Sequence, residues 1–201
     1  MYPDAPMIPT FTIDALLYGL VNDNAIIPPG PGALLVAHPS MDDPNFARTV
    51  VLLIIHDGED GTTGVVINRR GEPGDIIAGS PLVPWVVASA PPTIHFVGGP
   101  VQPDGVLCLR RDDSSSSGVV SVDLVDDFPD PSVPHRMFIG YAGWAPEQLR
   151  QEIAAGGWFV VPSEPGDVFD PDPATLWKRV LGRQSGEITR LRNYPEDPSL
   201  N

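Results

Sequence analysis

The 201-residue sequence predicts an α+β domain with a largely antiparallel or mixed β-sheet. Short apolar or alternating segments typical of strands recur along the chain, and most are joined by loops of hairpin length. Only two or three segments have helical punctuation. With 25 prolines and 20 glycines the chain is rich in turns, and its 42% apolar content is sufficient for a core. These features favour an α+β domain over a helical bundle.

Residues 1–31 are rich in proline and acidic at intervals, and we interpret them as an N-terminal extension with one short helix around Asp14–Leu20. Residues 32–201 then form a single domain. Its predicted strands are 33–37, 48–56, 64–69, 93–97, 105–110, 119–125, 136–142 and 157–161. The strands at 48–56 and 64–69 form a hairpin. Residues 50–55 are continuously apolar, which predicts burial on both faces of that strand. Residues 93–97 and 105–110 form a second strand–turn–strand unit, and "RDDSSSSG" (111–118) is a mobile solvent loop.

Two helices are predicted near the C-terminus. The first spans 146–155, with Pro146 at its first position and Gly156 just past its end. Gln148 is placed to reach back as half of a capping box. The second spans 173–181, with Asp172 as N-cap and Gly182 as the C-terminal stop.

The formal net charge of −14 opposes direct binding to nucleic acid, because phosphate contacts depend on Lys and Arg. Basic residues gather only near the C-terminus, at Lys178, Arg179, Arg183, Arg190 and Arg192. We interpret these residues as a helix end and a solvated tail. A transcription factor that reads DNA directly is therefore disfavoured.

The single cysteine, Cys108, excludes an intramolecular disulfide and fits a reducing compartment. It lies in the alternating stretch "GVLCLRR", which predicts a half-buried strand thiol and not a nucleophile. The first basic residue is Arg48, so the positive start of a signal peptide is missing, and no apolar run has the length of a membrane span. We expect a cytoplasmic protein without a membrane segment.

The stretch "AHPSMDDPNFARTVVLLIIHD" (37–57) collects the polar residues most suited to chemistry. His38, Asp42, Asp43 and Asn45 could bind a metal, but their spacing matches no specific metal motif. The alternative is a turn, since Ser40 and Asp42 are turn residues and Pro44 restricts Asp43 to an extended or turn conformation. We interpret the stretch as a turn that leads into a buried strand.

Other catalytic motifs are absent from the sequence. No G-x-S-x-G elbow supports Ser40 as a hydrolase nucleophile. The glycine-bearing loops "VGGPVQPDG" and "GYAGWAPE" lack the spacing of phosphate-binding loops, and tight turns explain them.

Several motifs together resemble the YqgE/AlgH family of bacterial proteins. They are "GALLVAHPSMDDPNFARTVVLLIIHD", "GTTGVVINR", "FVGGPVQPDGVL", "GYAGWAPEQLRQEIAAGGWFVVP" and "LWKRVL", and the resemblance runs from about Gly32 to the C-terminus. It implies a branched β-sheet around a small barrel-like core flanked by a few helices. It also implies an intracellular protein with a proposed role in transcriptional regulation, and it brings no catalytic residues, cofactor or DNA-binding motif.

Two functional hypotheses follow. The first is a non-enzymatic protein that binds a protein partner or small ligand and acts indirectly on gene expression, without a cofactor. Its candidate binding residues are His38, Ser40, Asp43, Asn45, Arg48, Tyr141 and Trp144. The alternative is a metal-assisted hydrolase that uses His38, Asp42 or Asp43, and His56.

Overall fold

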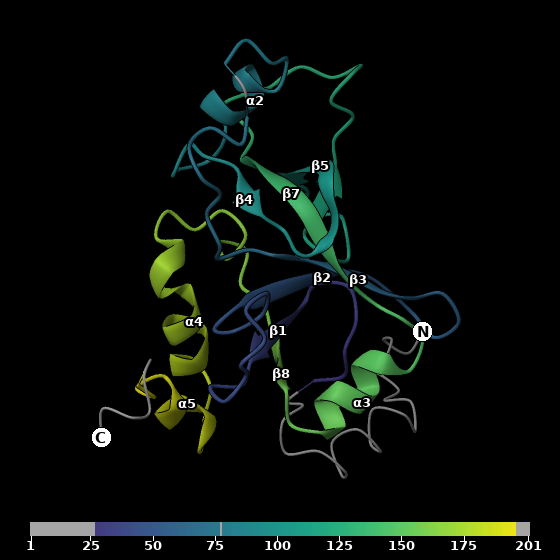
Figure 1. Cartoon of the computed structure of the whole chain (residues 1–201), viewed down its shortest axis with the longest axis vertical. Helices are drawn as coiled ribbons and strands as arrows, with labels where there is room; N and C mark the ends of the chain where they lie inside the picture. Colours follow the sequence, from purple (N-terminus) through teal and green to yellow (C-terminus); the bar gives the residue numbers. More distant parts are fainter. Residues whose placement is uncertain (1–26, 77, 196–201) are drawn as a thin grey trace, which may run out of the picture.

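Eight strands form one branched sheet in the computed structural model, which describes residues 27–76 and 78–195 (Figure 1). The strands are β1 (Ala33–Ala37), β2 (Val50–Asp57), β3 (Gly61–Val66), β4 (Phe96–Val97), β5 (Val101–Arg111), β6 (Val119–Ser121), β7 (His135–Trp144) and β8 (Trp158–Pro162). The helices are α2 (Val83–Val87), α3 (Gln148–Ala154), α4 (Pro173–Gly182) and α5 (Ile188–Leu191). The predicted α+β class is confirmed. The helix expected around Asp14–Leu20 lies outside the described residues.

The sheet branches at β7. Its path runs β6-β5-β7-β3-β2-β1-β8, and all neighbours on this path are antiparallel. β4 lies off the path and pairs with β7 in parallel, so the sheet is mixed. The end strands β6 and β8 are not paired, so the barrel-like core that the resemblance implied is an open, curled sheet and not a closed barrel.

Alternating side chains of β1, β2 and β8 enter two apolar clusters on opposite faces of the sheet. Leu34 and Val36 of β1 join a cluster that contains Trp177 of α4. Leu35 joins a second cluster that contains Ile153 of α3. Figure 1 shows the two helices on either side of these strands. Because both faces are covered, each fully buried leucine contributes roughly 1.5–3 kcal/mol to folding.

The predicted burial of residues 50–55 is confirmed only in its first part. Val50–Leu53 are buried, whereas Ile55 is 55% exposed. The register with β3 shifts between Leu53 and Ile55, and such a bulge interrupts the alternation of a strand. Ile55 therefore faces solvent.

Residues 93–97 and 105–110 contribute to β4 and β5, as the predicted strand–turn–strand unit expected, but these two strands do not pair with each other. Phe96 of β4 and Leu107 of β5 both align with Phe138 of β7, so β4 and β5 lie on opposite sides of that strand. α2, in a connection rich in proline and glycine, covers this upper part of the sheet, where Trp85 packs with Met137. The pairing partner of β4 comes about 40 residues later, beyond the reach of local turn signals.

The helix ends agree only partly with the predicted caps. The Ala145 N–H donates to Gln148 Oε1 (3.0 Å), as the half capping box predicted. Asp172 is the residue before α4, but its carboxylate accepts from the Thr175 hydroxyl (2.6 Å) and not from a backbone N–H. α3 begins at Gln148, two residues after the predicted start.

Candidate functional site

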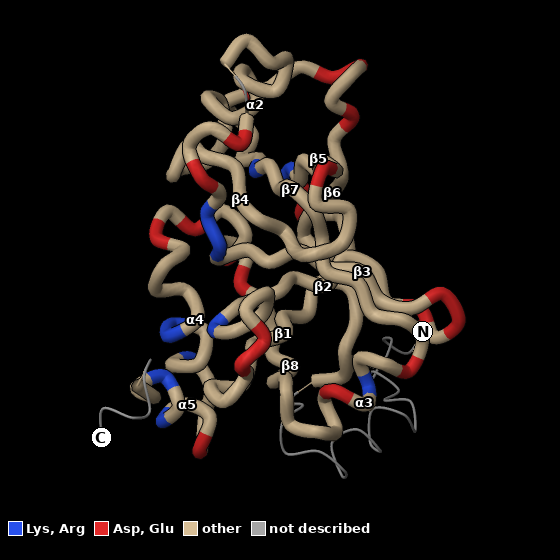
Figure 2. The backbone as a smooth tube through the Cα atoms, viewed as in Figure 1, with Lys and Arg blue, Asp and Glu red and all other residues tan. Residues whose placement is uncertain are grey.

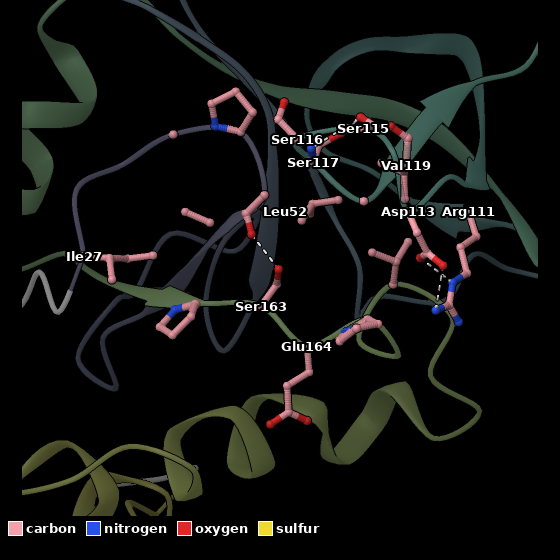
Figure 3. A pocket seen from close by; sticks show the side chains of 18 of the residues that line it. Ile27, Leu52, Arg111, Asp113, Ser115, Ser116, Ser117, Val119, Ser163 and Glu164 are labelled. Atoms are coloured by element: carbon pink, nitrogen blue, oxygen red, sulfur yellow. Dashed lines mark hydrogen bonds and ion pairs between the residues drawn. The ribbon is translucent and has the colours of Figure 1, made fainter. Parts of the chain in front are cut away.

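The two ends of the strand path face each other across a cavity of about 700 Å³ (Figure 3). One wall is the turn between β5 and β6, and the other is formed by the start of β1 and the segment that follows β8. Its lining is Ile27, Pro28, Gly30, Pro31, Gly32, Ala33, Leu52, Arg111, Asp113, Ser115, Ser116, Ser117, Gly118, Val119, Pro162, Ser163, Glu164, Pro165, Val168 and Phe169. A volume of this size suits a small ligand.

Gly32, in one wall, lies close to the serine-rich turn in the other. Its φ is +86°, and a Cβ built there would lie 2.6 Å from the carbonyl oxygen of Ser116. Only glycine fits such a position without strain. The Gly32 carbonyl also accepts a hydrogen bond from the Ser163 hydroxyl (2.6 Å), which ties the residue after β8 to the start of β1.

The serine-rich turn is built into this wall. Ser117 is buried, and its hydroxyl donates to the Val119 carbonyl (2.9 Å). The hydroxyls of Ser115 and Ser117 lie 3.0 Å apart. The prediction of a solvent loop at 111–118 is therefore wrong for Ser117. The residue types alone could not show that this turn packs against Gly32, about 80 positions earlier.

Charged groups at the rim of the cavity are paired. Arg111 donates from Nε to Asp113 (2.8 Å), and Figure 3 shows this pair beside Val119. Glu164 pairs with Arg183 of the segment after α4 (2.8 Å). The cavity therefore offers a ligand paired charges at its rim, serine hydroxyls and an apolar floor that includes Leu52.

The loop between β1 and β2 contains five of the seven predicted binding residues, and its first part is a hydrogen-bonded turn. His38 Nδ1 lies 2.7 Å from the Ser40 hydroxyl, and its ring packs on Phe159 (5.4 Å between ring centres). Burial lowers the pKa of His38. Asp43 accepts the N–H of Asn45 (2.8 Å), as in an Asx turn. This agrees with the interpretation of the stretch as a turn.

Arg48, at the end of this loop, and Asn68, in the segment after β3, hold the loop in place. Arg48 donates to the Tyr194 carbonyl (2.9 Å), and its guanidinium lies 4.7 Å from the ring centre of Trp177. Asn68 donates to the Arg48 carbonyl (2.9 Å) and accepts the Val50 N–H (2.8 Å).

Arg69 was not among the predicted site residues. Its guanidinium donates to the carbonyls of Pro44 (2.9 Å) and Asn45 (2.8 Å), so it fastens the loop to the segment after β3. It ends the motif "GTTGVVINR", but the motif did not indicate that its side chain contacts the loop after β1.

Trp144 belongs to an aromatic cluster on the opposite face from His38. It stacks with Phe46 (6.0 Å) and meets Trp158 edge-on (5.9 Å). The indole N–H groups of both tryptophans donate to one oxygen of Glu152, at 2.9 and 2.8 Å. Tyr141 packs instead against the cluster that contains Trp177. The seven predicted residues therefore lie on both faces of the sheet and do not share one groove.

The residues of the metal-hydrolase alternative are not brought together. β1 and β2 are antiparallel with Val36 opposite Val50, so His38 lies beside the start of β2. His56 lies six residues further along β2, roughly 20 Å away at 3.3 Å per residue, and hydrogen-bonds Thr62 (2.7 Å). Over residues 27–76 and 78–195, no group of three His, Cys, Asp or Glu side chains could hold a metal.

The glycine-bearing loops also have a structural explanation. A Cβ on Gly98 or Gly99 would overlap backbone atoms of Gly140 or Tyr141 in β7. These glycines allow the backbone after β4 to lie against that of β7, which is a structural role but a different one from the predicted tight turns. Within the described part of the chain, no helix is long and apolar enough to cross a membrane.

The sequence and the fold were compared with those of known proteins. The AlgH-like family profile matches residues 34–189. A UPF0301 protein of Streptomyces coelicolor is 42% identical over 186 residues, which cover 85% of this chain and 94% of that protein. A UPF0301 protein of Thermobifida fusca is 41% identical with the same coverage.

Two solved structures share the fold. A crystal structure of a Corynebacterium diphtheriae protein superposes with a TM-score of 0.71 at 30% identity, covering 92% of this chain and all of that one. The solution structure of the AlgH protein from Pseudomonas aeruginosa gives 0.53 at 26% identity, covering 77% and 94%. The chain belongs to the YqgE/AlgH family, the UPF0301 proteins.

Proposed function

We propose that this protein is a non-enzymatic binding protein that acts indirectly in regulation by taking up a small polar ligand in the cavity between the two ends of its sheet. One observation carries the proposal: the cavity is lined by both ends of an unclosed strand path. A ligand seated there would contact the β5–β6 turn and the segment after β8 together. Its binding energy would stabilise one separation of the two walls over others.

The loop after β1 is the second candidate place for a ligand, since it holds His38, Ser40, Asp43 and Asn45. The geometry favours the cavity, because the guanidinium groups of Arg48 and Arg69 already donate to backbone carbonyls around that loop. A ligand would have to displace those bonds. We place the protein in the cytoplasm, where its single cysteine would remain a thiol.

A native mass spectrum of the untagged protein, purified gently from the cells that produce it, tests the proposal. We expect an additional mass of ligand size. Replacing Ser116, which lines the cavity, by tyrosine should remove that mass. Replacing Ser114, an exposed residue of the same turn outside the lining, should retain it.

A panel of small polar metabolites provides the second measurement. A ligand of the cavity should raise the unfolding temperature of the parent chain and of Ser114→Tyr, and leave that of Ser116→Tyr unchanged. A bare spectrum together with no stabilisation by any metabolite would contradict the proposal.

A further inference from the structure

The loop between β6 and β7, residues 122–134, presents the two most exposed large apolar side chains of the described residues. Val125 is 89% exposed and Phe128 is 87% exposed. Val87 of α2 is 69% exposed in the same upper part of the molecule. In Figure 1 this loop forms the upper right margin, away from α3 and α4.

The loop is anchored at its base. Val122 is buried with Trp85 and Met137, and Leu124 packs against the same cluster. α2 supplies Trp85, so Val87 stands on a helix that shares this cluster with the loop. The outward side chains therefore project from a segment held by apolar contacts, and they do not belong to a free tail.

Local hydrogen bonds give the loop its shape. Asp123 accepts the N–H groups of Val125 (2.8 Å) and Asp126 (3.3 Å). Asp130 accepts the N–H and the hydroxyl of Ser132, at 2.8 and 2.7 Å, and these bonds lower the pKa of Asp130. Asp123 and Asp130 thus fix both sides of the segment that carries Val125 and Phe128.

The charge of the loop has one sign. Residues 122–134 contain four aspartates and neither Lys nor Arg. Figure 2 shows acidic positions along this margin and no basic one. Single exposed apolar residues are ordinary on protein surfaces. Here two of them lie within four positions of each other, in an acidic segment shaped by local hydrogen bonds and anchored on the cluster of Trp85 and Met137.

We propose that residues 122–134 dock onto a protein partner whose groove has an apolar floor for Phe128 and Val125 and a rim of Lys or Arg side chains. Charge complementarity selects this occupant. Nucleic acid and anionic membrane surfaces carry the same sign as the loop and would repel it. A second copy of this chain, with a net charge of −14, would also repel it. The proposal does not rest on the ligand cavity.

Site-specific crosslinking in the cells that produce the protein tests the surface. The full chain carries a photo-reactive phenylalanine at position 128, and a matched chain carries it at position 55, where Ile55 is 55% exposed on another part of the sheet. We expect a discrete protein adduct from position 128 and none of that mass from position 55. The crosslinked segment of the partner should be rich in Lys and Arg.

Titration with the purified partner then separates the two parts of the proposal. Val125→Ser with Phe128→Ser should weaken binding at least tenfold, and Ile55→Ser should leave it unchanged. Asp126→Asn with Asp127→Asn should also weaken binding and flatten its dependence on salt. Thermal unfolding should be unchanged in all variants, because the replaced side chains are exposed.

Four results would overturn the proposal. They are the absence of an adduct at position 128, an adduct with a second copy of this chain or with nucleic acid, a crosslinked segment without Lys or Arg, and binding that is indifferent to Phe128.

Discussion

Glu152 shows how one side chain organises an aromatic cluster. A single carboxylate oxygen accepts both indole N–H groups, from Trp144 and Trp158, and the other oxygen accepts the Gln148 amide (2.9 Å). Both tryptophans are buried. Removing the carboxylate would leave two buried donors without an acceptor, a cost of about 1–3 kcal/mol each.

We therefore expect Glu152→Ala to lower the free energy of unfolding by roughly 2–5 kcal/mol. Glu152→Gln should cost less, since its amide oxygen can still accept from the indoles. Urea unfolding followed by tryptophan fluorescence measures both. Glu59→Ala, at an exposed position of the β2–β3 turn, is the matched control and should change stability by less than about 0.5 kcal/mol. Equal stabilities of Glu152→Ala and the control would contradict the role of Glu152.

His38 contributes a pH dependence. Burial lowers its pKa, so the folded state favours the neutral ring more than the unfolded state does. Below about pH 6.5 the unfolded chain binds more protons at this residue, and stability is lost as the pH falls through the folded pKa. In His38→Gln the loss of stability between pH 7 and pH 5 should be smaller than in the parent chain. Urea unfolding at both pH values measures it, and an unchanged difference would contradict the assignment.

Cys108 is a strand thiol, as the sequence predicted. It lies in β5 as an interior thiol, but it is 1% exposed and not half-buried. Burial raises its pKa to about 12. A thiol with that pKa is a poor nucleophile at neutral pH, so the residue is part of the core.

At the scale of elements, replacing each of two glycines by alanine tests the contact between the start of β1 and the serine-rich turn. Gly32 and Gly118 both have positive φ, but only Gly32 faces the Ser116 carbonyl, whereas a Cβ on Gly118 would meet open space. Gly118→Ala should cost about 1–2 kcal/mol for its backbone conformation alone. Gly32→Ala should cost about 1–3 kcal/mol more for the overlap. Thermal unfolding measures both, and equal losses would show that the two walls do not depend on this contact.

The strands could be predicted where burial is local and continuous. The apolar runs of β1, β2 and β8 appear in the sequence because both faces of these strands are covered, and the β2–β3 hairpin follows from its Gly and Asp turn. The pairing of β4 with β7 and the bulge before Ile55 could not be predicted, because each depends on contacts between distant segments. The same holds for the cavity, whose walls come from three separate segments.

At the scale of the whole molecule, charge decides which partners are available. The basic residues near the C-terminus are partly neutralised, since Arg179 pairs with Asp170 (2.6 Å) and Arg183 with Asp167 (2.8 Å). Figure 2 shows basic positions grouped on α4 and α5, with acidic positions at the edges of this group. Lys178 and Arg179 lie in the second half of α4, as the interpretation as a helix end expected. Arg190 lies in α5 and Arg192 follows it, so the predicted solvated tail contains a short helix.

We expect no retardation of duplex DNA by this protein in a gel-shift titration at physiological salt, because a net charge of −14 opposes phosphate contacts. A basic DNA-binding protein of similar mass serves as the positive control. Tight binding that depends on the DNA sequence would show that net charge does not prevent DNA binding here, and it would contradict the proposed indirect action.

The pairing of β1 with β8 has a consequence for biosynthesis. Ala33 is opposite Pro162, so β1 leaves the ribosome about 130 residues before its neighbour. At roughly 5–20 residues per second, this apolar strand waits on the order of ten seconds with one edge unsatisfied. Throughout that interval the nascent chain exposes a template for aggregation, and its yield in the cell should depend on chaperones that shield β1 until translation ends.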